Sequence, residues 1–233
     1  MAGLTESEVA ETIRRYSERL RKFGVCEQTL GWTHGRQMVR FEALTSLFPL
    51  QNHHILDIGC GFGDLNHLLK KKCGDNYRYT GVDLVPELIG EAHRLWNAPN
   101  ISFHVGDFSA VGNLVRADFA VASGVLNHKL LESDNYAVAE EMLLKALRCC
   151  SIGVAFDFLT DRVDYRLEHT FHYDPCRIME IALRFSRRVV LRNDYLPFEF
   201  TVVVLRDDEV DRSTGRFMRP SSFNSCGDHS EHR

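Results

Sequence analysis

The sequence predicts an α/β protein in which helices cover a mostly parallel β-sheet. From His54 onward, short apolar runs alternate with segments of helical period, and this rhythm is typical of strand and helix units around a parallel sheet. Of the 233 residues, 44% are hydrophobic and 26% are charged, which gives enough apolar surface for one sizeable core. We therefore expect a single domain over residues 1–206, with a helical part at 1–50 and the α/β core at 51–206.

Two helices are expected ahead of the first strand. Thr5 and Glu8 have the spacing of a capping box, and apolar residues then recur at intervals of three and four as far as Gly24. A second helical pattern runs from Met38 to Leu47 and ends before a proline.

The core is expected to alternate strands with helices. The expected strands cover residues 54–58, 77–82, 101–105, 117–122, 152–158, 188–192 and 198–205. The expected helices cover residues 64–73, 86–96, 134–147 and 175–185. The last two strands are joined so closely that we expect them to pair antiparallel. Residues 207–233 are polar and without period, so we expect a disordered tail there.

Charge and cysteine usage limit the partners and the compartment. The formal net charge is −4, so no global positive field attracts a polyanion, and nucleic acid is not an expected partner. The seven cysteines are scattered and form no C-x-x-C pair, which favours reduced thiols in the cytoplasm. No apolar run is long enough for a membrane span, so no membrane partner is expected. The pattern leaves the oligomeric state open.

A strand that runs into a glycine-rich turn carries the strongest functional signal. Asp57 is followed by Gly59, Gly61 and Gly63, and such glycines let the backbone turn sharply and approach a nucleotide-type cofactor. A dinucleotide fingerprint requires glycine at the next position, where this chain has Asp64. A carboxylate there disfavours the pyrophosphate of NAD or FAD, but it suits the cationic S-adenosylmethionine.

Acidic residues at the ends of the next two strands extend the pattern. Asp83 lies at about the 20-residue spacing at which a carboxylate accepts hydrogen bonds from ribose hydroxyls. Its alternative role is to cap the helix that begins at Pro86. Asp107 and Phe108 follow the third strand, where they are suited to accept a hydrogen bond from an adenine amino group and to pack on its ring.

With these motifs, residues 55–205 resemble the class I S-adenosylmethionine-dependent methyltransferases. The resemblance rests on the D-x-G-x-G-x-G run and on the two later aspartates. It implies S-adenosylmethionine as cofactor, S-adenosylhomocysteine as product, and a three-layer αβα sandwich. Its sheet has seven strands with an antiparallel last pair, and the two N-terminal helices cap the cofactor cleft. The residues expected to bind the cofactor are Asp57, Gly59, Cys60, Gly61, Asp83, Leu84, Asp107, Phe108 and Ser123.

The loop after the fourth strand borders the transferred methyl group in this family. Here it contains Asn127 and His128, and it lacks both the [DN]-P-P-[YF] run of DNA amine methyltransferases and the paired glutamates of protein arginine methyltransferases. His128 is the expected general base for an oxygen or nitrogen acceptor, against the alternative of a histidine that only bonds the backbone. Asn127 is expected to orient the cofactor or the acceptor.

Further candidates for substrate contact or for a lid come from two segments. They are Tyr16, Trp32 and Arg40 in the N-terminal part and Tyr165, His169 and His172 in the polar, aromatic stretch 160–174. His169, His172 and Asp174 also resemble a metal set, but no second cluster supports one, so no metal is predicted.

The function predicted is methyl transfer from S-adenosylmethionine to an oxygen or nitrogen of a small molecule. Methylation of RNA or protein is the alternative if the arginines at 184–192 line the mouth of the cleft. A non-catalytic scaffold that keeps the cofactor fold is the second alternative.

Overall fold

A single mixed sheet forms the centre of the protein. The computed structural model describes residues 3–32, 35–108 and 115–217. The strands of the sheet are β1 (His54–Ile58), β2 (Arg78–Asp83), β3 (Ile101–Val105), β4 (Ala117–Ala122), β5 (Cys150–Leu159), β6 (Val189–Arg192) and β7 (Glu199–Leu205). They lie in the order β3-β2-β1-β4-β5-β7-β6. All neighbours are parallel except β7, which runs antiparallel to both β5 and β6, as predicted.

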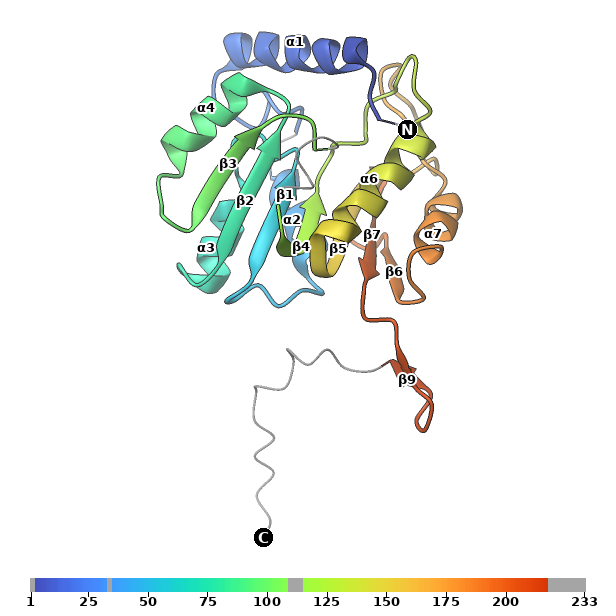
Figure 1. Cartoon of the computed structure of the whole chain (residues 1–233). Helices are drawn as coiled ribbons and strands as arrows, with labels where there is room; N and C mark the ends of the chain where they lie inside the picture. Colours follow the sequence, from blue (N-terminus) through green and yellow to red (C-terminus); the bar gives the residue numbers. More distant parts are fainter. Residues whose placement is uncertain (1–2, 33–34, 109–114, 218–233) are drawn as a thin grey trace.

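Helices cover both faces of the sheet and make the three predicted layers (Figure 1). They are α1 (Glu6–Phe23), α2 (Arg36–Thr45), α3 (Leu65–Cys73), α4 (Pro86–Leu95), α6 (Asn135–Cys149) and α7 (Pro175–Leu183). On one face, Leu44 of α2 and Leu68 of α3 share a core with Ile55 of β1. On the other face, Leu143 of α6 and Ile178 of α7 belong to a second core. Because strand residues alternate between the two faces, both surfaces of the sheet are apolar and both are buried.

The strand order reverses between β1 and β4. The chain first builds β2 and β3 on one side of β1 and then returns to place β4 on the other side. The loops that follow β1 and β4 therefore diverge, and open α/β sheets bind their ligands in the crevice that this reversal leaves.

Helix α1 lies across this carboxyl edge of the sheet, above the strands in Figure 1. The predicted capping box is confirmed, since Thr5 Oγ1 accepts from the Glu8 backbone and the Glu8 carboxylate accepts from the Thr5 backbone. Ile13, Tyr16 and Leu20 pack α1 against a small apolar cluster of the glycine-rich turn and the region around α4. The first helix is thus a roof over the edge where ligands bind.

Helix α2 differs from its predicted apolar stripe. Phe41 and Leu44 are buried against the sheet, whereas Met38 is 38% exposed and Leu47 is 39% exposed. The helix packs on a sheet face with one side only and ends at Thr45. Arg40 of α2 lines the pocket at the carboxyl ends of the strands.

A short hairpin lies inside the segment that the sequence predicted to be disordered. Strands β8 (Val210–Asp211) and β9 (Arg216–Phe217) pair antiparallel, so residues 207–217 differ from that prediction. Local hydrogen bonds to the Asp211 carboxylate hold the turn. Because these contacts are polar, the sequence shows no apolar period that would have indicated the hairpin. The rest of the predicted tail, residues 218–233, lies outside the described residues. The division into one domain at 1–206 stays a prediction.

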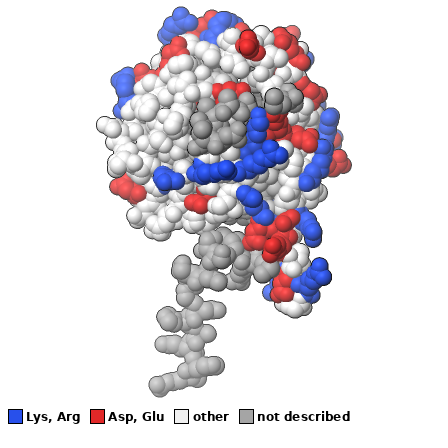
Figure 2. Space-filling view, in the orientation of Figure 1, with Lys and Arg blue, Asp and Glu red and all other residues white. Residues whose placement is uncertain are grey.

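The described residues contain no helix that is long and apolar enough to cross a membrane. The six cysteines within the described ranges are all free thiols. On the face of the molecule in Figure 2, several basic side chains lie side by side across the middle, with acidic side chains near them.

Candidate active site

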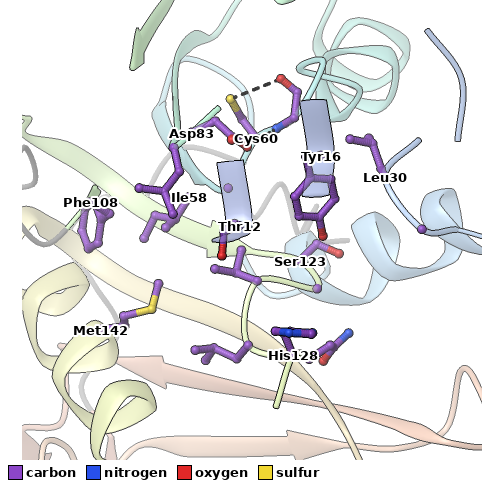
Figure 3. Close-up of a pocket in the computed structure, with 18 of the residues that line it drawn as sticks. Thr12, Tyr16, Leu30, Ile58, Cys60, Asp83, Phe108, Ser123, His128 and Met142 are labelled. Atoms are coloured by element: carbon purple, nitrogen blue, oxygen red, sulfur yellow. Dashed lines mark hydrogen bonds between the residues drawn. The ribbon is translucent and has the colours of Figure 1, made fainter. Parts of the chain in front are cut away.

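A pocket opens at the carboxyl ends of the central strands, beneath α1. Its volume is about 460 Å³, within the range of small-ligand sites. Asp83 and Cys60 lie at one end and His128 at the other, with Thr12 and Tyr16 of α1 between them (Figure 3). All nine residues predicted to bind the cofactor line this pocket, and so do Asn127 and His128.

The glycine-rich turn requires glycine for its backbone shape. Gly59 has φ 70° and Gly61 has φ 54°, both in the left-handed region that other residues rarely adopt. A Cβ atom at Gly59 would lie 2.3 Å from Val125 Cγ2, and one at Gly61 would lie 2.9 Å from Leu30 Cδ2. The turn therefore brings backbone directly to the wall of the pocket.

Asp83 ties this turn to the second strand. Its Oδ2 accepts from the Gly61 backbone at 2.8 Å, and its Oδ1 accepts from the Val85 backbone at 2.9 Å. A carboxylate has about four acceptor positions, so capacity remains for ligand hydroxyls. Burial raises the pKa of Asp83 above its usual range. The residue thus combines the predicted ligand contact with support of the loop.

Asp57 lies deeper, beside Asp83. Its Oδ2 accepts a hydrogen bond from the Tyr79 hydroxyl at 2.7 Å. Burial raises the pKa of Asp57 to about 7, and the charges of Asp83 and Asp64 add to the effect. Asp64 itself accepts from Gln37 Nε2 at 3.1 Å and does not line the pocket.

An aspartate that the sequence analysis missed holds the loop after β4. Asp157 Oδ2 accepts from Ser123 Oγ at 2.7 Å, and its Oδ1 accepts from the Gly124 backbone at 2.6 Å. Burial raises its pKa to about 6. Its signal was the same as that of Asp83, an acid near the carboxyl end of a parallel strand, and this signal could have identified it.

A buried ion pair supports the same loop from the side. Arg40 forms a bidentate pair with Glu199 at the start of β7, and both side chains are buried. The Arg40 guanidinium stacks 4.0 Å from the ring of Trp32. The Trp32 ring occupies the space that a Cβ atom at Gly124 would need. Arg40 Nη1 has no hydrogen-bond partner within the described part of the chain.

His128 meets a side chain from α1. Arg15 donates a hydrogen bond to His128 Nε2, so this nitrogen carries the lone pair. Burial, the Arg15 charge and His169 lower the pKa of His128 to about 4. The neighbouring Asn127 Oδ1 is buried and has no partner among the residues that the structure describes.

The stretch 160–174 folds against the loop after β4. The Lys129 backbone donates to His169 O at 3.0 Å, and the Phe171 backbone donates to Asn127 O at 3.0 Å. The rings of His128 and His169 are 6.3 Å apart, and His169 and Tyr165 both line the pocket. This segment is therefore a wall of the site.

The structure does not bring His172 to the pocket. Its Nδ1 lies 2.8 Å from Thr160 O and its Nε2 lies 3.0 Å from Thr170 Oγ1, so both ring nitrogens bond within the loop. Over residues 3–32, 35–108 and 115–217, no group of three His, Cys, Asp or Glu side chains is arranged to hold a metal ion.

Helix α1 supplies residues that the sequence analysis did not select. Thr12, Arg15 and Arg19 line the pocket together with the predicted Tyr16. Burial and the Asp83 charge raise the pKa of the Tyr16 phenol. The helical period indicates which side of α1 is apolar, but no pattern relates that helix to a loop so far away in the chain.

Comparison with known proteins agrees with this geometry. A family model described as "Methyltransferase domain" matches residues 55–148. The protein named "Putative methyltransferase Rv1506c" of Mycobacterium tuberculosis is 34% identical over 157 residues, which are 64% of this chain and 91% of that protein. This chain belongs to the class I S-adenosylmethionine-dependent methyltransferases.

Solved structures share the fold of this methyltransferase. Magnesium protoporphyrin IX methyltransferase of Synechocystis PCC 6803 with bound S-adenosylmethionine aligns with a TM-score of 0.60 at 18% identity, over 88% of this chain and 99% of that one. The N-methyltransferase NodS of Bradyrhizobium japonicum with S-adenosylhomocysteine aligns with a TM-score of 0.59 at 17% identity, over 83% of this chain and 97% of that one. At such identities the likeness concerns the fold.

The residues around the pocket fit the family's cofactor, S-adenosylmethionine. The Asp57 and Asp83 carboxylates suit a cationic ligand with ribose hydroxyls, and they would repel a pyrophosphate. Among the described residues the buried Asn127 Oδ1 has no hydrogen-bond donor, and the ammonium group of this cofactor can supply one.

Proposed function

We propose that this methyltransferase acts on a small molecule. The proposal rests on the walls of the pocket: α1 and the stretch 160–174 both contribute residues to its lining, together with His128. A folded RNA or protein would need an open groove to reach His128. A pocket of about 460 Å³ lined by both segments favours an acceptor that enters it whole.

The structure does not support the alternative function, methylation of RNA or protein. It required the arginines at 184–192 to line the mouth of the cleft, and none of them lines the pocket. They pair elsewhere, Arg184 with Glu140, Arg188 with Asp207 and Arg192 with Asp194. The basic run thus has a structural explanation.

The proposed cofactor contacts follow the lining of the pocket. Asp83 accepts from the ribose hydroxyls, and Asp107 and Phe108 hold the adenine. Asp57 and Asn127 face the amino-acid end, next to Ser123 and the pair of Trp32 and Arg40. The remaining backbone and side-chain contacts come from Gly59, Cys60, Gly61 and Leu84. When bound, the cofactor supplies an electrophilic methyl group on a cationic sulfur.

The general-base role of His128 stays a prediction, and two observations weaken it. A pKa lowered to about 4 makes the imidazole a weak base at neutral pH. Its lone pair already accepts from Arg15. His128 with His169 and Tyr165 remains the proposed contact surface for the acceptor. The free thiols of the described cysteines support the cytoplasm as the compartment.

Calorimetry and a labelled-methyl assay test the proposal. We expect the purified protein to bind S-adenosylhomocysteine and to give no heat with NAD. With labelled S-adenosylmethionine and a cell extract, we expect label in the low-mass fraction and none in RNA or protein. Heat with NAD alone would contradict the cofactor assignment. Label in RNA or protein would contradict the small-molecule acceptor, and cofactor binding without any transfer would support the scaffold alternative.

A further inference from the structure

Arg15 presents an incompletely paired cation at the acceptor end of the pocket. Its side chain is 28% exposed and lines the pocket, where it donates to the neutral imidazole of His128. Its carboxylate contact is with Glu11 Oε1 at 3.7 Å, beyond hydrogen-bond distance. Glu11 in turn forms a bidentate pair with Arg14 at 2.9 and 2.8 Å.

The other charged groups near this end are differently placed. Lys145 pairs with Glu141 at 2.6 Å, and Arg19 donates to the backbone carbonyls of Thr29 and Gln28. Both arrangements satisfy the cation within the protein. Arg15 instead donates its hydrogen bond to an imidazole that itself lines the pocket, and its contact with a carboxylate is long.

Apolar and aromatic side chains line the same pocket as Arg15. Leu130, Met142 and Leu167 are among them, and so is Tyr165, which has 64% of its surface exposed. A guanidinium in such surroundings binds an oxyanion better than it does in open water, because the charges are less screened. The same walls suit an apolar body attached to the anion.

We propose that the acceptor is an oxyacid with an apolar body, and that Arg15 binds its anionic group while one of its oxygens receives the methyl group. The proposal rests on the proposed function and narrows its substrate class. An ionised oxyacid needs no general base, because no proton leaves it. The acid oxygen forms a bond to the methyl carbon, the carbon–sulfur bond breaks, and its electron pair stays on sulfur. His128 is then a positioning residue that holds the guanidinium of Arg15.

Fragment binding to the protein saturated with S-adenosylhomocysteine tests this site. The probes are benzoate and phenylphosphonate, with benzamide and benzylamine as uncharged and cationic counterparts. We expect the two anions to bind, to shift the ring resonances of His128, and to bind at least about tenfold more tightly than benzamide or benzylamine. Equal binding of benzamide and benzoate would overturn the proposal.

Three variants separate a loss of anion binding from a general loss of folding. Arg15→Gln should weaken benzoate about tenfold or more, while S-adenosylhomocysteine affinity stays within a few-fold. Arg21→Gln is the matched control, because Arg21 lies exposed on the same helix and does not line the pocket. Glu11→Gln removes the competing carboxylate and should tighten benzoate by up to about fivefold, a gain that misfolding cannot mimic. Unchanged benzoate binding in Arg15→Gln would contradict the assignment.

The labelled-methyl assay distinguishes a carboxylate acceptor from a phosphonate acceptor. A carboxylate acceptor gives a methyl ester that releases volatile methanol in base, whereas a phosphonate ester keeps its label. Either product supports the oxyacid. A base-stable methyl on an amine or a neutral hydroxyl would overturn this inference but leave the proposed function intact. Failure to bind S-adenosylhomocysteine at all would instead remove the proposed function.

Discussion

Glu8, Asp57 and Asp157 are all buried carboxylates, yet their pKa values move in opposite directions. Burial alone would raise the pKa of Glu8, but hydrogen bonds from Ser133, Thr5 and Glu132 lower it to about 2. Asp57 and Asp157 accept fewer hydrogen bonds, and burial raises their pKa values to about 7 and about 6. At Glu8 the hydrogen-bond donors therefore outweigh the burial of the carboxylate, whereas at Asp57 and Asp157 burial outweighs the fewer donors.

The titration of Asp57 should make cofactor binding depend on pH. In the free protein its pKa is about 7, and the ammonium group that S-adenosylmethionine and S-adenosylhomocysteine share binds the ionised form better. The affinity for S-adenosylhomocysteine should therefore rise as the pH rises through about 7 and level off above it, with a proton released on binding. Calorimetry in two buffers between about pH 6 and 8 measures this. Asp57→Asn, which can still accept from Tyr79, should remove the dependence, and a pH profile unchanged by the substitution would contradict the role of Asp57.

Asp83→Ala should weaken both S-adenosylmethionine and S-adenosylhomocysteine. Losing two hydrogen bonds to a charged group costs about 3–5 kcal/mol, or some 10²–10³-fold in affinity. The loss includes the support that Asp83 gives the glycine-rich turn through Gly61. Calorimetry with both ligands measures it, and Glu87→Ala, at an exposed position of α4, is the control. Binding within a few-fold of the unaltered protein would exclude Asp83 as a ribose ligand.

Among the helices and strands, segments with a clear apolar pattern could be predicted from the sequence, whereas contacts between distant segments could not. Strands β1, β3 and β4 have the predicted bounds, because each is a short apolar run between clear turn signals. The start of β5 was missed, since the strand begins at Cys150 directly after α6 ends, without a turn residue. The motif residues of the pocket follow strand ends and could be predicted. Arg15 and Glu199 could not, because their partners lie in distant segments.

Glu8 should hold α1 against the loop that contains Glu132 and Ser133. Its carboxylate accepts from the backbones of Glu132 and Ser133 at 3.1 and 3.0 Å and from Ser133 Oγ at 2.7 Å. Glu8→Ala leaves these donors unpaired, so we expect faster hydrogen exchange in α1 and dissociation of S-adenosylhomocysteine about tenfold faster or more. Glu18→Ala, on the exposed side of the same helix, is the control. Equal dissociation rates in the two variants would refute the fastening role.

The same residue should make α1 sensitive to acid. A pKa lowered to about 2 from its ordinary 4.5 means that the contribution of Glu8 to stability is present above about pH 4.5. That contribution is lost as the pH falls through about 2, where the carboxylate is protonated in the folded protein.

The whole molecule separates its two ends. The pocket lies at the carboxyl edge of the sheet, whereas the hairpin of β8 and β9 lies beyond the opposite edge (Figure 1). Among the described residues, the contacts of segment 207–217 with the sheet include Arg188 with Asp207 and with the ring of Phe217, and the Arg187 backbone with the Asp208 carboxylate. Events at the hairpin are therefore remote from ligand binding.

Truncation after Arg206 should leave ligand affinity unchanged and cost little stability. The loss of the Arg188 contacts is that of a partly exposed ion pair, worth about 0–1 kcal/mol, so Tm should fall by at most a few degrees. Truncation after Phe217 should leave Tm unchanged. Thermal melts with and without S-adenosylhomocysteine measure both. A larger fall for the shorter chain would make the hairpin a structural part of the domain.

Because α1 covers the pocket, we expect the ligands to bind and leave in a fixed order. Tyr16 and Arg15 of this helix both line the pocket, and Arg15 bonds His128, so we expect one helix to cover both ligands. Tyr165 lines the pocket and is 64% exposed, and we expect an acceptor seated beside it to block the exit of the cofactor. S-adenosylmethionine should therefore enter first and S-adenosylhomocysteine leave last. Initial-rate kinetics should give inhibition by S-adenosylhomocysteine that is competitive against S-adenosylmethionine and non-competitive against the acceptor, and competition against both would mean random order.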